Sequence, residues 1–314
     1  MSIVASGQLP STRRANGGPV PAGSAGDARD HRRMELCLAT GRIVAVEVAG
    51  HDDGTPVLLC HGLADSRLTA RWLAPAAAEL RLRVIAPDRP GTGGTDRRWL
   101  SQVADWARDA TEVLDALQVD SAAVLGISGG GPFAAACAAR IPRRVRSLLL
   151  VSALGQPDWP SAGMAPGERV SLTLATLSPA FGGWSLNRLA ALARRSPELF
   201  LRLAATAQPD VDIRALQDPG LRDSFLTGYL EAFRRGSWGV AQDLRVLTRP
   251  WGFDLRSIEA PTWVLHGDAD TTVPVQHARR YARAIPAARL QVRPGHGHFS
   301  ILAEPRDALA LLVG

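Results

Sequence analysis

The residue with the clearest chemical potential in this sequence is a serine bracketed by glycines, Ser128. The apolar run 123–127 before it is too short for a helix, and the alanine-rich segment after it has a helical pattern. This order predicts a strand, a sharp turn and a helix, with the serine in a strained backbone conformation. Gly126 and Gly130 leave room where side chains would collide with the neighbouring strand and helix. The N–H groups at the start of the helix suit an anion that develops beside the serine.

A serine hydroxyl is a weak nucleophile near neutral pH, so it needs a base and a third group that orients the base. Two loops downstream offer both kinds of residue. Asp268 and Asp270 follow one apolar run, and His296 and His298 follow another. The chain order serine, aspartate, histidine is typical of one hydrolase architecture. The residues alone leave open which aspartate and which histidine would act.

Short apolar segments must position these side chains. Runs at 34–38 and 43–48, joined by Thr40-Gly41, predict an antiparallel hairpin at a sheet edge. Further buried strands are expected to alternate with amphipathic helices, and they fall at 57–60, 83–86, 123–127, 145–151, 262–266 and 289–292. This pattern predicts an α/β fold with a mostly parallel eight-stranded sheet covered by helices on both faces. Catalytic loops of such sheets lie at the carboxyl ends of the strands.

The chain divides into three parts. Residues 1–30 are rich in Gly, Pro, Ser and Ala and are predicted to be a disordered tail. Residues 155–250 show a helical pattern that interrupts the core, 31–154 and 251–314. An insertion between two strands of one sheet should lie over their carboxyl ends and form a lid. Its tryptophans are candidates for pocket walls or for packing between lid helices: Trp159, Trp184 and Trp238.

Outside the insertion, most of residues 34–314 resemble the α/β-hydrolase fold family. The resemblance rests on five motifs together, because a lone G-x-S-x-G occurs by chance in many chains. They are the elbow Gly126-Ile127-Ser128-Gly129-Gly130, the His61-Gly62 pair, the Asp88-Arg89-Pro90-Gly91 loop, the Gly267…Asp270…Val273-Pro274 loop and Gly297-His298-Phe299.

The resemblance implies a role for each residue of the site. It makes Ser128 the nucleophile, Asp270 the orienting acid and His298 the general base, in preference to Asp268 and His296. The oxyanion hole is expected to use two backbone N–H groups, those of Leu63 and Gly129.

Other polar residues near these motifs are expected to be structural. By the same resemblance His61, Asp88 and Arg89 brace loops. As single histidines, His266 and His277 are expected to be ordinary loop or capping residues. Asp158 is a further possible acid that we expect only to mark the start of the lid.

The function implied is that of a cofactor-free serine hydrolase that forms an acyl-enzyme on a carboxylic ester, lactone or thioester of a small apolar molecule. A serine at the elbow argues against epoxide hydrolases and haloalkane dehalogenases of this fold, which need a carboxylate nucleophile. C–C bond hydrolases, aminopeptidases and cofactor-free haloperoxidases with the same triad remain alternatives, as does a non-enzymatic ligand-binding scaffold. The aspartates and histidines lack the spacing of a zinc site, so no metal is expected.

The composition of the chain limits the kinds of partner that the protein is expected to bind. The chain has 314 residues, 46% hydrophobic and 21% charged, which suits one large α/β domain with an insertion. All 36 basic residues are arginines dispersed along the sequence, so the net charge of +6 does not predict nucleic-acid binding. No apolar run is long enough to span a bilayer. Three cysteines in apolar segments, Cys37, Cys60 and Cys137, are expected to be buried thiols of a reducing compartment. These features predict a cytoplasmic monomer or homodimer with a small-molecule substrate.

Overall fold

The computed structural model describes residues 31–165, 179–206 and 208–313. The predicted tail, residues 1–30, lies outside them. Eight strands form one sheet in the order β1-β2-β4-β3-β5-β6-β7-β8. Their bounds are β1 His31–Cys37, β2 Ile43–Gly50, β3 Thr55–Cys60, β4 Leu82–Pro87, β5 Ala122–Ile127, β6 Val145–Val151, β7 Thr262–Gly267 and β8 Ala288–Arg293.

The sheet is antiparallel at one edge and parallel elsewhere. β1 pairs with β2, and β2 with β4, in antiparallel fashion, whereas all pairs from β4 to β8 are parallel. The β1–β2 turn contains Gly41 at φ +77°, a conformation that favours glycine. The predicted hairpin and the eight-stranded sheet are both confirmed.

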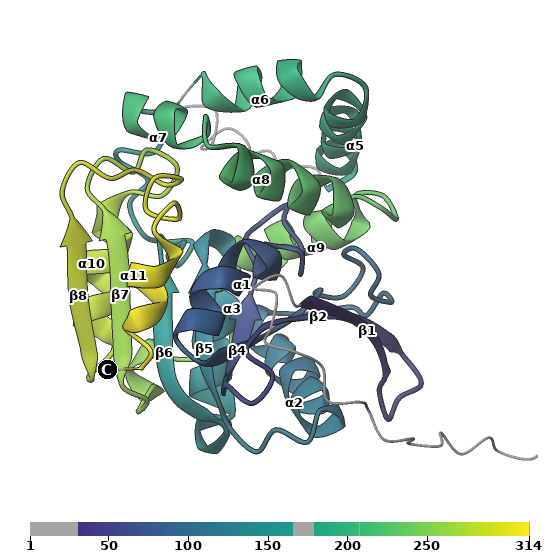
Figure 1. Ribbon diagram of the computed structural model, residues 1–314, viewed down its shortest axis with the longest axis vertical. Coiled ribbons are helices and arrows are strands. Elements are labelled where there is room, and N and C mark those ends of the chain that lie inside the picture. The colour runs from purple at the N-terminus through teal and green to yellow at the C-terminus, as the bar shows by residue number, and fades with distance from the viewer. Residues whose placement is uncertain (1–30, 166–178, 207, 314) are drawn as a thin grey trace, which may run out of the picture.

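Helices cover both faces of the sheet. The core helices are α1 Thr69–Glu79, α2 Trp106–Ala116, α3 Gly131–Arg140, α10 Val275–Ala284 and α11 Pro305–Ala310. Short 3₁₀ turns occupy Val103–Asp105, Ser128–Gly130, Pro142–Arg144 and Leu255–Ser257. α1 and α11 pack on one face, and α2, α3 and α10 pack on the other (Figure 1).

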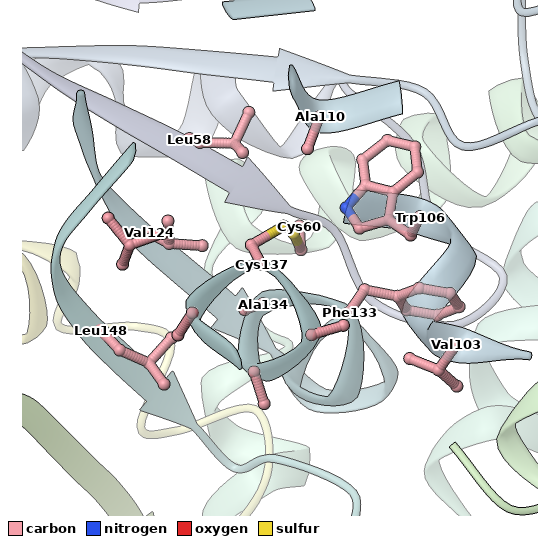
Figure 2. Close-up of a cluster of buried hydrophobic side chains, with 14 of the residues drawn as sticks. Leu58, Cys60, Val103, Trp106, Ala110, Val124, Phe133, Ala134, Cys137 and Leu148 are labelled. Carbon is pink, nitrogen blue, oxygen red and sulfur yellow. The ribbon is translucent and has the colours of Figure 1, made fainter. Parts of the chain in front are cut away.

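The central strands are apolar throughout because both of their faces are buried. In β3, Leu58 and Cys60 point to the face of α2 and α3, whereas Val57 and Leu59 point to the face of α1. Figure 2 shows the first of these clusters, in which Trp106 and Phe133 meet edge to face with ring centroids 6.4 Å apart. This packing fixes β5, and with it the turn that carries Ser128.

Between β6 and β7 the described chain is helical. The helices are α5 Pro179–Arg195, α6 Pro197–Ala205, α7 Asp210–Ala215, α8 Pro219–Ala232 and α9 Trp238–Leu247. In Figure 1 they lie above the carboxyl ends of the strands, with α9 nearest the sheet. Phe200, Tyr229 and Phe233 belong to an apolar cluster of their own, so the insertion has a small core distinct from those of the sheet.

The prediction for the cysteines is wrong at one position. Cys60 and Cys137 are buried, and Figure 2 shows their sulfurs side by side. Cys37 is exposed. It ends the edge strand β1, in which every residue except Met34 and Leu36 is exposed.

Candidate active site

Ser128 occupies a sharp turn between β5 and α3. Its φ is +54°, a strained conformation for a residue with a side chain. A Cβ on Gly126 would lie 2.6 Å from Cβ of Ala134, and one on Gly130 would lie 2.0 Å from the carbonyl oxygen of Cys60. Only glycine fits these two positions, and the turn therefore has the tightness that the sequence predicted.

Three residues from separate loops meet at this turn. Nε2 of His298 lies 3.0 Å from Oγ of Ser128, and Nδ1 of the same ring lies 2.8 Å from Oδ2 of Asp270. The aspartate accepts from Nδ1–H, which leaves Nε2 free of hydrogen and able to accept from the serine hydroxyl. The structure thus brings together Ser128, Asp270 and His298 in one hydrogen-bonded chain.

Asp270 is buried, with its carboxylate fully partnered. One oxygen accepts from the backbone N–H groups of Thr272 and Val273, at 2.9 and 2.8 Å. The other faces His298 and also His266, whose Nε2 is 3.3 Å away. Burial alone would raise the pKa of Asp270, but its electrostatic interaction with His298 and the hydrogen bonds from His266 and His298 hold that pKa well below its usual range. The carboxyl group of Asp270 is therefore ionised near neutral pH.

The two residues that were expected to form an oxyanion hole, Leu63 and Gly129, lie close together. A Cβ on Gly129 would lie only 3.0 Å from N of Leu63, so the two segments are in contact. The Leu63 loop is held by Arg89, whose guanidinium donates to the carbonyl oxygens of His61 and Gly62 at 2.6 and 2.8 Å. Burial and the nearby charge of Arg89 lower the pKa of His61, which therefore stays neutral and acts as a structural residue.

The competing acids and base lie elsewhere. Asp268 is exposed and accepts from the N–H of Gly295 at 2.7 Å. His296 faces Glu304 at 3.4 Å, and Asp158 is exposed. None of these three residues takes part in the chain of hydrogen bonds at Ser128.

A cavity of about 450 Å³ opens above the serine. Its floor includes Leu63, Ser128 and His298, and nearly half of its lining comes from the insertion, including apolar side chains such as Leu186, Phe200 and Phe225. Among the described residues that line it, none is an arginine or a lysine. Asp65 is its one carboxyl group from that part of the chain.

None of the three candidate tryptophans of the insertion lines the cavity. Trp159 packs on Tyr281 with ring centroids 5.0 Å apart, Trp238 covers Gly91, and Trp184 is 56% exposed. The tryptophan that lines the cavity is Trp72 of α1. Trp159 and Trp238 pack against core segments instead, because each lies at an end of the insertion where it meets the core.

Comparison with known proteins gives the family. The sequence model of the alpha/beta hydrolase fold matches residues 55–305. This chain belongs to the α/β-hydrolase fold family. It is 30% identical over 268 residues to 2-hydroxymuconate semialdehyde hydrolase of Pseudomonas putida, covering 84% of this chain and 88% of that protein.

Solved structures agree with this assignment. An alpha/beta hydrolase fold protein from Nakamurella multipartita has a TM-score of 0.67 and 26% identity, over 90% of this chain and 99% of that one. An esterase from Thermogutta terrifontis has a TM-score of 0.65 and 24% identity, over 90% and 97%, and shows the fold alone. The match to this family and the similarity to a named hydrolase together show that this α/β-hydrolase is a hydrolytic enzyme.

Three polar residues of this α/β-hydrolase were not singled out as functional from the sequence. His266 contacts Asp270, a contact that its place at the end of a strand, four residues earlier, could have suggested. Asp65 accepts from the N–H groups of Gly62 and Ser66 at 3.4 and 2.7 Å and so holds the loop that carries Leu63. Asp212, from α7, is fully buried against the loop of His298.

The described part of this α/β-hydrolase contains no group of three or more His, Cys, Asp or Glu side chains arranged to hold a metal ion. Within the same residues, no helix is long and apolar enough to cross a membrane.

Proposed function

We propose that this hydrolase is a serine esterase that acts on a neutral ester of a small apolar acid, with lactones and thioesters as related substrates. The observation that carries the proposal is the hydrogen-bonded chain Ser128–His298–Asp270 at the floor of an apolar cavity. A serine paired with a histidine, which is oriented by a buried carboxylate, is the arrangement that activates a hydroxyl for attack on a carbonyl.

In this mechanism Nε2 of His298 takes the hydroxyl proton as Oγ of Ser128 attacks the carbonyl carbon of the ester. The N–H groups of Leu63 and Gly129 stabilise the oxyanion that forms. Collapse of the tetrahedral intermediate breaks the bond to the alkoxide, which leaves with the proton held by His298. Water then attacks the carbonyl carbon of the acyl-enzyme and gives a proton to His298. The bond between this carbon and Oγ of Ser128 breaks, His298 returns the proton to Oγ, and the free acid is released. Asp270 stays ionised and stabilises the imidazolium in both halves of the reaction.

The helical insertion supports the part of the proposal that concerns substrate choice. Its side chains supply nearly half of the residues that line the cavity, so we assign to it the role of a lid that selects the acyl group. Leu189 of α5 and Leu203 of α6 line the cavity and are also 44% and 50% exposed, so the cavity reaches the surface beside these two helices.

C–C bond hydrolysis is the second candidate, favoured by the 30% identity to 2-hydroxymuconate semialdehyde hydrolase. The substrate in that name is a carboxylate. A carboxylate removed from water needs a cationic or hydrogen-bonding partner. The described cavity lining has no arginine, and its polar side chains other than those of His298 and Asp65 are uncharged groups such as those of Gln208, Ser224 and Tyr229. The absence of a cation in this lining, together with the carboxyl group of Asp65, favours a neutral substrate.

Labelling with a fluorophosphonate tests the nucleophile. The wild-type enzyme should be modified at Ser128, Ser128→Ala should not be modified, and Ser101→Ala, which removes an exposed serine, should label like wild type. Absence of labelling in the wild type, or equal labelling of Ser128→Ala, would overturn the proposed mechanism.

A matched pair of esters tests whether the enzyme prefers a neutral substrate. p-Nitrophenyl butyrate and the p-nitrophenyl monoester of succinic acid differ in a terminal carboxylate. We expect kcat/KM to be about 100-fold higher for the butyrate, since burying an unpaired carboxylate costs several kcal/mol. Preference for the succinate, or efficient turnover of 2-hydroxymuconate semialdehyde with none of the butyrate, would favour the second candidate.

A further inference from the structure

Asp212 is a buried aspartate that the insertion contributes to the loop of His298. It lies in α7 and has no exposed surface. Its Oδ2 accepts from the backbone N–H of His298 at 2.7 Å, and its Oδ1 accepts from those of Phe299 and Ser300 at 3.0 and 2.8 Å. One carboxylate therefore receives three consecutive backbone donors from a segment 86 residues away, counted from Asp212 to His298.

These donors belong to a helical turn that begins at the histidine. The N–H groups of Leu302 and Ala303 donate to the carbonyl oxygen of Phe299 at 3.0 and 3.2 Å. The first N–H groups of a helical turn have no acceptor inside the turn, so an outside group must satisfy them. A carboxylate is the strongest available acceptor, because hydrogen bonds to an ionised oxygen are charge-assisted.

The fit of Asp212 depends on the residue before the histidine. A Cβ on Gly297 would lie 2.2 Å from Oδ2 of Asp212 and 2.5 Å from its Cγ. The glycine is thus required for the carboxylate to reach the N–H of His298. Gly297 therefore has a structural role of its own, which is to leave room for the carboxylate of Asp212.

The same part of the insertion also meets the loop of Asp270. Oγ1 of Thr272 donates to Oε1 of Gln208, which lies just before α7, at 3.2 Å. The N–H of Thr272 in turn donates to Asp270 at 2.9 Å. The α7 region therefore contacts both loops that form the acid–base half of the site.

We infer that Asp212 is a positioning residue, which holds the backbone of His298 so that Nε2 faces Ser128 and Nδ1 faces Asp270. The inference rests on the proposed function, since it assigns Asp212 to the placement of the general base. Its three hydrogen bonds go to backbone N–H groups, so it acts through the histidine and not on the substrate. The helical insertion then has two roles: it lines the cavity, and through Asp212 it positions His298.

The test compares Asp212→Asn with Asp210→Asn, which removes the same charge from an exposed position of the same helix. In Asp212→Asn, the amide that replaces the carboxylate would turn an NH₂ group toward at least one backbone N–H. We expect kcat for p-nitrophenyl butyrate to fall about 100-fold, because a small displacement of a catalytic group lowers the rate by about that factor. We expect KM to change less than about twofold. Asp210→Asn should keep wild-type kcat.

A spectroscopic readout separates positioning from general stability. The Nδ1–H proton of His298 that is shared with Asp270 should give a downfield proton resonance, shifted or lost in Asp212→Asn and kept in Asp210→Asn. Gly297→Ala provides a second variant, which displaces the carboxylate without removing its charge and should have the same two effects. Near-ultraviolet circular dichroism checks that each variant is folded.

The possible results of this test distinguish a failure of the inference about Asp212 from a failure of the proposed function. Wild-type kcat and an unchanged resonance in Asp212→Asn would overturn the inference, as would a raised KM with normal kcat, or loss of folding in both Asp212→Asn and Gly297→Ala. A wild-type enzyme that neither labels nor hydrolyses esters would overturn the proposed function instead, and the resonance of His298 would then decide the role of Asp212 alone.

Discussion

At the scale of single residues, the site depends on places where a side chain cannot fit. Ser128 keeps a φ of +54° because β5 and α3 are both buried in the core and determine the path of the chain between them. Gly129 lies against Leu63, and Gly297 lies against Asp212. The absence of a Cβ lets the backbone N of Leu63 lie close to Gly129, and it lets the carboxylate of Asp212 lie close to Gly297.

Gly129→Ala tests the oxyanion hole. The new Cβ would lie 2.7 Å from Cβ of Leu63 and 3.0 Å from its N, so the two proposed donors must separate. We expect kcat for p-nitrophenyl butyrate to fall about 10²–10³-fold, the usual cost of losing one oxyanion donor. Steady-state kinetics together with the thermal midpoint check this, and a folded variant with kcat within about twofold of wild type would contradict the assignment.

At the scale of elements, buried ion pairs join the insertion to the loops of the core. Arg89 follows β4 and is fully buried, and its Nε donates to Asp243 of α9 at 2.8 Å. The same guanidinium holds the carbonyl oxygens of His61 and Gly62. Arg67 similarly joins Asp88 to Glu231 of α8, at 2.5 and 2.7 Å. The insertion is thus anchored to the core through Arg67 and Arg89.

Arg89→Ala tests the first of these anchors. It leaves Asp243 buried without its cation, which should lower the free energy of unfolding by about 3–5 kcal/mol. Arg108→Ala is the control, because Arg108 forms only an exposed pair with Glu112 and should cost less than about 0.5 kcal/mol. Urea unfolding measures both, and equal losses would show that the buried anchor carries no special weight.

At the scale of the whole molecule, buried titratable groups make stability depend on pH. Burial raises the pKa of Asp88 to about 6, and the attraction of Arg67 only partly offsets this. A carboxyl group with a raised folded pKa binds more protons in the folded state than in the unfolded state. Between about pH 4 and about pH 6, Asp88 therefore lowers stability as pH rises.

The comparison of wild type with Asp88→Asn isolates this effect, because the lowered pKa values of His61 and His277 act in the opposite direction and are shared by both proteins. Over that range the stability of wild type relative to the variant should decline by at most about 1.4 kcal/mol per pH unit. Urea unfolding at several pH values measures it. Parallel curves, or a relative gain with rising pH, would contradict the prediction.

The sequence by itself determined the sheet and the elbow, and it limited the partners of Ser128 to two aspartates and two histidines. Apolar strands, glycines at a tight turn and the order serine, aspartate, histidine are local signals, readable within a few residues of each position. The resemblance to a known family then selected Asp270 over Asp268 and His298 over His296. The position of each loop at the carboxyl edge of the sheet followed from the alternation of strands and helices.

Only the tertiary structure decided which residues surround that site. Trp72 lines the cavity in place of Trp159, Trp184 and Trp238, and Asp212 reaches the loop of His298 across 86 residues. Such contacts depend on the docking of the insertion helices over the sheet. That docking is set by the summed packing of many side chains, so no short stretch of sequence carries its signature.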